Sequence, residues 1–179
     1  MELYIIRHGE TVLNVQKIVQ SHIPGKLTEL GISQARELGK SLSDIKFDYI
    51  YCSELARTEE TLQNILSELK YPPPNSNIIY TSEIQEINLH SLEGKPTEML
   101  KKMRENYETF RLNKNDKGDE CRIDCFLRAS IFLDKIINKF IDKNYNSGIN
   151  ENNVYELNKD FKNEIENEIF YENFNKGEY

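Results

Sequence analysis

Residues 3–11 read LYIIRHGET, and this stretch decides the fold. Four apolar residues in succession, without the alternation of a half-exposed strand, are typical of a strand buried on both faces of a parallel sheet. The run ends at Arg7, His8 and Gly9, so two polar side chains follow directly on the strand. In α/β proteins, ligands bind beyond the carboxyl ends of the strands. We therefore expect Arg7 and His8 to lie in the functional site.

Strands and helices alternate along the rest of the chain. Residues 47–52 and 78–80 read as further short strands. Four amphipathic segments predict helices, with Thr28 and Ser53 as the N-caps of the first two, Pro96 opening the third and the fourth starting near Asp119. This order implies parallel strands with helices on both faces. The predicted class is α/β, a three-layer sandwich with a mostly parallel central sheet flanked by helices.

Composition excludes several classes of function. A chain of 179 residues has the size of about one domain, and its formal net charge of −7 disfavours binding to nucleic acid or to an anionic membrane through the whole surface. No apolar run approaches the ~18 residues that a membrane span requires. Three cysteines without a CxxC pair are too few for a disulfide-stapled secreted domain, which predicts a cytoplasmic protein.

The last fifth of the sequence differs from the rest. Residues 144–179 are acidic and rich in asparagine, with few apolar anchors. Such a composition is typical of a weakly ordered tail, although Leu157, Phe161, Ile165 and Ile169 recur at helical spacing and permit one helix. We expect one folded domain over residues 1–143 and a weakly ordered or helical tail over 144–179.

Two predicted strand ends carry cations. The first leads into Arg7 and His8, and the second leads through Ser53 to Arg57 in the first turn of the following helix. A guanidinium group presents a fork of donors that matches phosphate oxygens, and a neutral imidazole is a competent nucleophile near neutral pH. Together these residues predict a site for a phosphate group.

Five blocks of residues, in a fixed order along the chain, allow comparison with a known family. They are residues 3–11 with Asn14, residues 27–31 with Gln34 and Ala35, residues 50–58 with Thr61, Glu86 followed by Glu93 and Gly94, and Gly118 with Arg128. In this order they resemble the histidine phosphatase superfamily, the phosphoglycerate mutase-like proteins. The resemblance covers about residues 3–137 and implies the same α/β fold.

The resemblance also implies roles for individual residues. His8 would attack phosphorus and form a phosphohistidine, and Glu86 would protonate the leaving oxygen and later activate water. Arg7 and Arg57 would bind the phosphoryl oxygens, with further donors from Asn14 and the Thr11 hydroxyl. Glu83 stands three residues before Glu86 and is an alternative acid. With two guanidinium groups holding the charge, no metal and no cofactor is required.

One feature of the family is missing. Its second histidine belongs to a His-Gly pair after a late strand, whereas the histidines here are His8, His22 and His90. We expect the fold to lack one core strand, because the chain is truncated, is a splice form or is a degenerate member; truncation is the preferred explanation. An exposed sheet edge would favour self-association into a homo-oligomer.

The short segment between Gly94 and Gly118 favours a phosphomonoester hydrolase, since the mutases of this family carry a long insertion there. The expected substrate is a phosphorylated small molecule or a phosphoprotein. Two alternatives stay open, a phosphoglycerate mutase-type phosphotransferase and a phosphoanion-binding or interaction protein impaired by the missing histidine.

Overall fold

The computed structural model describes residues 2–105 and 118–144. The chain divides into two compact units, residues 1–132 and 133–179, and the first holds every residue that the sequence places in the site. The expected tail lies outside the described residues from position 145 onward. Within the described ranges, no helix has both the length and the apolar character needed to cross a bilayer.

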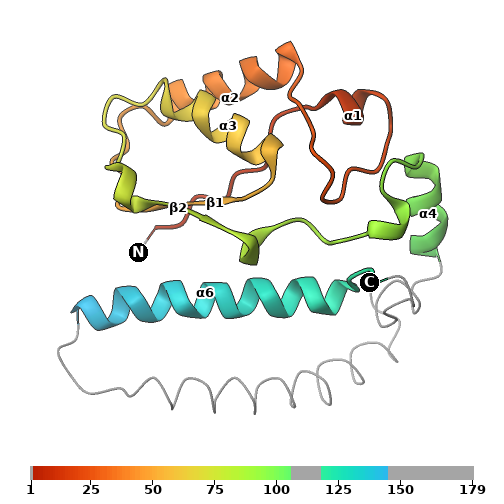
Figure 1. Ribbon diagram of the computed structural model, residues 1–179. Coiled ribbons are helices and arrows are strands. Elements are labelled where there is room, and N and C mark those ends of the chain that lie inside the picture. Colours follow the sequence, from red (N-terminus) through yellow and green to blue (C-terminus); the bar gives the residue numbers. More distant parts are fainter. Residues whose placement is uncertain (1, 106–117, 145–179) are drawn as a thin grey trace. The chain divides into compact units, whose positions relative to one another are not determined.

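Two parallel strands lie at the centre of the first unit (Figure 1). Strand β1 (Ile50–Ser53) pairs with β2 (Ile78–Thr81), with Ile50 opposite Ile78 and Ser53 opposite Thr81. The parallel pairing confirms the predicted α/β class. It also brings the chain segments that follow β1 and β2 to the same edge of the sheet.

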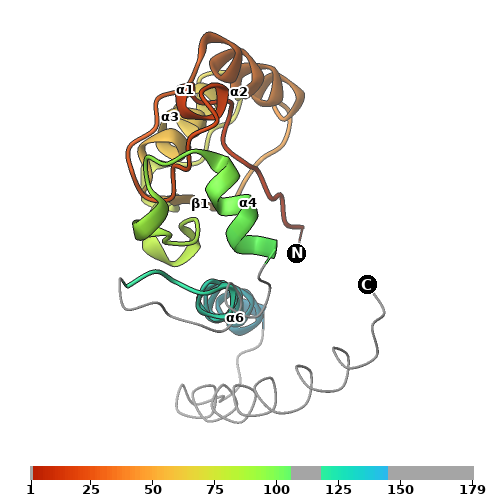
Figure 2. The ribbon, with the colours of Figure 1, turned by 90° about the vertical axis from the view of Figure 1, so that its right-hand side faces the viewer.

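Helices α2 (Glu29–Ser41) and α3 (Ala56–Leu66) pack side by side over one face of these strands (Figures 1 and 2). Their shared core is an apolar cluster of Ala35, Leu42, Ile65 and Leu69. Gly39 allows this close packing, because a Cβ there would fall 2.7 Å from the carbonyl oxygen of Ile65. As predicted, Thr28 caps α2, its hydroxyl accepting a bond from the Gly31 amide at 3.0 Å.

The remaining elements are shorter, apart from the last helix. They are α1 (Val12–Val15), the 3-10 turns η1 (Asn75–Asn77), η2 (Ser82–Ile84) and η3 (His90–Leu92), then α4 (Thr97–Glu105) and α6 (Arg122–Asn144). Phe132 of α6 packs edge-on against Tyr51 of β1, with ring centroids 5.2 Å apart. The first part of α6 therefore contacts the sheet.

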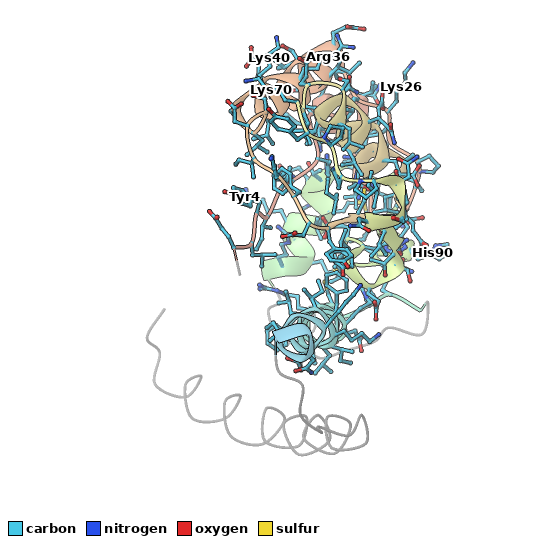
Figure 3. The ribbon with its side chains drawn as sticks, turned by 90° about the vertical axis from the view of Figure 1, so that its left-hand side faces the viewer. Tyr4, Lys26, Arg36, Lys40, Lys70 and His90 are labelled. Carbon is cyan, nitrogen blue, oxygen red and sulfur yellow. The ribbon has the colours of Figure 1, made fainter. Side chains whose placement is uncertain are left out.

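Two details of the predicted elements are wrong. Ser53 does not cap α3; it ends β1, and the helix begins three residues later, after an N-cap position held by Leu55 without a side-chain bond. Residues 3–6 form no strand with any described partner, and Ile5 is 88% exposed. No strand among the described residues pairs with the backbone of this apolar run. The ring of Tyr4 (Figure 3) packs edge-on against the Phe47 ring, with ring centroids 5.4 Å apart, and its hydroxyl donates to Glu2 Oε1 at 2.8 Å.

Candidate active site

The loop that begins at Arg7 is tightly held, although residues 3–6 before it are exposed. Gly9 is buried, and its amide donates to the Thr61 hydroxyl of α3 at 3.0 Å. A Cβ on Gly9 would fall 2.5 Å from the carbonyl oxygen of Gly31, and a Cβ on Gly31 would fall 2.1 Å from that of Glu10. The two glycines therefore let this loop run directly over the start of α2, which fixes the position of His8.

The His8 ring is half-buried and has one resolved partner. Its Nδ1 lies 2.8 Å from the carbonyl oxygen of Gly9. A carbonyl oxygen only accepts, so Nδ1 carries the proton and Nε2 is left with its lone pair. Burial lowers the pKa of His8 below its usual value; the Gly9 bond opposes this, while the charges of Arg57 and Arg7 lower the pKa further. The ring is therefore neutral at pH 7.

Arg57, the second residue of α3, is the most unusual side chain of the site. It is 2% exposed, and its Nη2 donates to the Ser21 carbonyl oxygen at 2.9 Å. Its Nε and Nη1 have no hydrogen-bond partner within the described residues. Burial lowers the pKa of this guanidinium, with Glu86 acting in the opposite direction. A buried cation with two unused donors is suited to bind an anion.

Arg7 and Glu86 are exposed, and both act electrostatically on His8 and Arg57. Glu86 follows η2, and its Oε1 accepts a bond from the Ile87 amide at 3.0 Å. The alternative acid, Glu83, is not among the charges that shift the pKa values of His8 or Arg57. The structure thus brings together four of the predicted residues, His8, Arg7, Arg57 and Glu86.

Thr11 and Asn14 form a capping box at the start of α1. The Thr11 hydroxyl donates to Asn14 Oδ1 at 2.9 Å and accepts from the Asn14 amide, and the side chain of Thr11 is fully buried. The proton of this hydroxyl is therefore engaged within the loop. Asn14 is exposed, and its Nδ2 is the group of this pair that remains suited to contact a ligand.

The segment carrying Glu86 is held by side chains that bond to its backbone. Arg128 of α6 donates to the carbonyl oxygens of Glu83 and Gln85, both at 2.9 Å. Arg128 also forms an ion pair of 2.9 Å with Glu120, whose carboxylate accepts a bond from the Asn88 amide at 2.8 Å. Sequence reasoning identified Arg128 as part of a motif but missed this contact and the role of Glu120, since neither follows from local spacing.

Comparison with known proteins agrees with the fold and the motifs. Residues 3–145 match the histidine phosphatase superfamily (branch 1), and the chain belongs to this family. It is similar to the fructose-2,6-bisphosphatase TIGAR of Bos taurus, with 37% identity over 102 residues, which cover 56% of this chain and 37% of that protein. It is also similar to the adenosylcobalamin/alpha-ribazole phosphatase of Escherichia coli K-12, with 42% identity over 72 residues, which cover 40% of this chain and 36% of that protein.

Solved structures give the same result. The alpha-ribazole phosphatase from Shigella flexneri superposes with a TM-score of 0.61 and 28% identity, covering 75% of this chain and 66% of that one. Bacillus stearothermophilus YhfR gives a TM-score of 0.61 and 28% identity over 74% of this chain and 65% of its own. The matched part of the chain spans about a third of the length of the curated relatives named above.

Proposed function

We propose that the chain is a phosphomonoester hydrolase that acts through a phosphohistidine on His8 and requires no metal ion. The observation that carries this proposal is that the His8 ring, with its Nε2 unprotonated, lies within the electrostatic influence of the buried Arg57 guanidinium. The ring presents an unprotonated Nε2, and the buried guanidinium beside it has two donors without a partner in the described part of the chain. Relatives named as phosphatases support the same reaction class.

In the first step, His8 Nε2 attacks the phosphorus atom of the ester. The N–P bond forms as the bond from phosphorus to the ester oxygen breaks, and Glu86 in its protonated form gives its proton to the leaving oxygen. Arg57 and Arg7 hold the negative charge on the equatorial oxygens. Asn14 adds a donor through its amide, while Thr11 holds Asn14 in place.

In the second step, water replaces the histidine. The Glu86 carboxylate takes a proton from the water as its oxygen attacks phosphorus, the N–P bond breaks, and inorganic phosphate leaves. His8 returns to its starting tautomer because the Gly9 carbonyl oxygen keeps the proton on Nδ1. Phosphorylated small molecules and phosphoproteins both satisfy this chemistry.

All three cysteines are free, which fits the reducing cytoplasm in which we place the protein.

Two alternatives share the same residues. A mutase-type phosphotransferase would pass the phosphoryl group to a second hydroxyl instead of water. A phosphoanion-binding protein would bind the group without turnover, and it would use the donors of Arg57 that have no partner within the described residues.

Acid-quench labelling with a radiolabelled phosphomonoester tests the proposal. We expect an acid-labile, base-stable phosphoenzyme, release of inorganic phosphate, and loss of both in His8→Ala. His90→Ala is the matched control, because the His90 side chain is 72% exposed and its ion-pair partner is Glu93, which is not one of the four site residues; Figure 3 labels His90. Label that survives His8→Ala would refute the assignment of His8 as the nucleophile. Phosphate-dependent stabilisation without turnover would support the binding protein.

A further inference from the structure

Ser21, in the loop between α1 and α2, has two unusual properties. It is 5% exposed, and its φ of +48° lies in the left-handed region, which favours glycine. A residue with a Cβ persists in such a conformation when its surroundings determine it strongly, and these residues cluster at functional sites. Glycine would adopt this backbone conformation without strain, whereas serine adds a hydroxyl whose contacts are specific.

The contacts of Ser21 connect two parts of the site. Its carbonyl oxygen accepts the Arg57 Nη2 bond at 2.9 Å. Its hydroxyl donates to the Ile87 carbonyl oxygen at 3.2 Å and accepts from the Leu89 amide at 2.7 Å. One residue therefore holds the buried guanidinium on one side and the backbone directly after Glu86 on the other.

The Glu86 carboxylate depends on this backbone for its position. The side chain is exposed, and its resolved hydrogen bond is to the amide of the next residue, Ile87. The neighbouring His22 reinforces the connection, because its Nε2 donates to the Glu86 carbonyl oxygen at 2.7 Å. The loop at residues 21–22 thus holds the backbone of residues 86–89 by three hydrogen bonds.

We infer that Ser21 is a positioning residue, whose hydroxyl fixes Glu86 relative to the phosphate group held by Arg57. This inference rests on the proposed function. It assigns to Ser21 the geometry of proton transfer to the leaving oxygen and leaves phosphate binding to Arg57. A displacement of a catalytic group by about 1 Å can reduce the rate roughly 100-fold.

The test compares two esters in Ser21→Gly, which keeps the carbonyl oxygen, accepts the left-handed backbone conformation and removes the CH2OH side chain with its hydroxyl. A primary alkyl phosphate needs a proton on its leaving oxygen, whereas p-nitrophenyl phosphate has a good leaving group and needs little help from an acid. The measured quantity is kcat/KM, which reports phosphoryl transfer to His8 and not the later attack of water, a step that both esters share. We expect kcat/KM for the alkyl ester to fall about tenfold or more, and kcat/KM for p-nitrophenyl phosphate to change by less than about twofold. The Kd for inorganic phosphate should stay within about twofold, because the Arg57 bond to the Ser21 carbonyl is kept.

Lys17→Gly is the matched control. Lys17 also has a positive φ, +55°, but its side chain is exposed and outside the site, so this variant relieves the same backbone strain without removing the hydroxyl of Ser21. Hydrogen exchange is the second measurement. The Leu89 amide should exchange faster in Ser21→Gly and at the original rate in Lys17→Gly.

The outcomes distinguish a failure of the positioning role of Ser21 from a failure of the proposed hydrolase function. Equal losses for both esters in Ser21→Gly, or unchanged exchange at Leu89, would overturn the positioning role while the enzyme remains a phosphatase. A starting protein that hydrolyses neither ester would overturn the proposed function and, with it, the positioning role of Ser21.

Discussion

Replacing Arg57 with methionine should stabilise the ligand-free protein and abolish its response to phosphate. The side chain is 2% exposed, and two of its nitrogen atoms, Nε and Nη1, have no partner within the described residues. Methionine is unbranched and fills a similar space without polar hydrogen atoms. Arg57→Met therefore removes a buried charge from a site that is completed only when an anion binds.

The magnitude follows from the hydrogen bonds. A buried donor without a partner costs about 1–3 kcal/mol, so two such donors cost about 2–6 kcal/mol. The substitution also leaves the Ser21 carbonyl oxygen without the Arg57 donor, which costs about 1–3 kcal/mol. The expected net gain in the free energy of unfolding is about 1–3 kcal/mol, or roughly 2–12 °C in Tm for a chain of this size. Phosphate at ten times its Kd should stabilise the starting protein by about 1.4 kcal/mol and the variant not at all.

Thermal unfolding followed by circular dichroism at increasing phosphate concentration measures both effects. Arg36→Met is the control, because Arg36 is exposed on α2 and its Nε bonds to Asn64 at 3.1 Å (Figure 3). This control should keep the phosphate response of the starting protein. A ligand-free Arg57→Met protein that melts below the starting protein, or one that phosphate still stabilises, would refute the reasoning.

Three further predictions concern the loop at His8. Because the pKa of His8 in the folded state lies below 6.5, the unfolded chain binds more protons than the folded chain near and below that pH. The free energy of unfolding should therefore fall as the pH drops from 6.5 towards the pKa of the folded state, and His8→Gln should flatten this dependence in urea unfolding. Gly31→Ala should lower the free energy of unfolding by about 1–3 kcal/mol, because its Cβ would meet the Glu10 carbonyl oxygen. Thr61→Val should cost about 1–3 kcal/mol, because the buried Gly9 amide loses its acceptor.

Each of these three predictions can be contradicted by a specific result. A stability curve for His8→Gln that falls below pH 6.5 as steeply as that of the starting protein would remove His8 as the cause. Chemical denaturation that shows Gly31→Ala or Thr61→Val as stable as the starting protein would mean that the loop adjusts without losing the contacts described above.

The sequence predicted those features that depend on residues close together in the chain. Thr28 caps α2 because its side chain accepts a bond from the amide three residues later. A cap of this kind can be predicted from a few consecutive residues. The strands β1 and β2 and the α/β class followed from short apolar runs separated by helical periodicity. The residues of the proposed phosphate site were predicted from ordered motifs, because the chemistry of phosphate binding restricts which side chains can serve.

Tertiary structure decided the rest, because the contacts involved join residues far apart in the sequence. Residues 3–6 have the composition of a buried strand, yet a strand exists only where a neighbour accepts and donates backbone hydrogen bonds. Among the described residues no strand pairs with this segment, and Ile5 is exposed. Ser21 and Ile87 are 66 positions apart, and no local pattern predicts the bond between them. The sequence by itself predicted which groups would perform the chemistry, because residue type sets what a side chain can do; the folded chain decided how these groups are held, since hydrogen bonds between distant backbone and side-chain atoms set the position of each group.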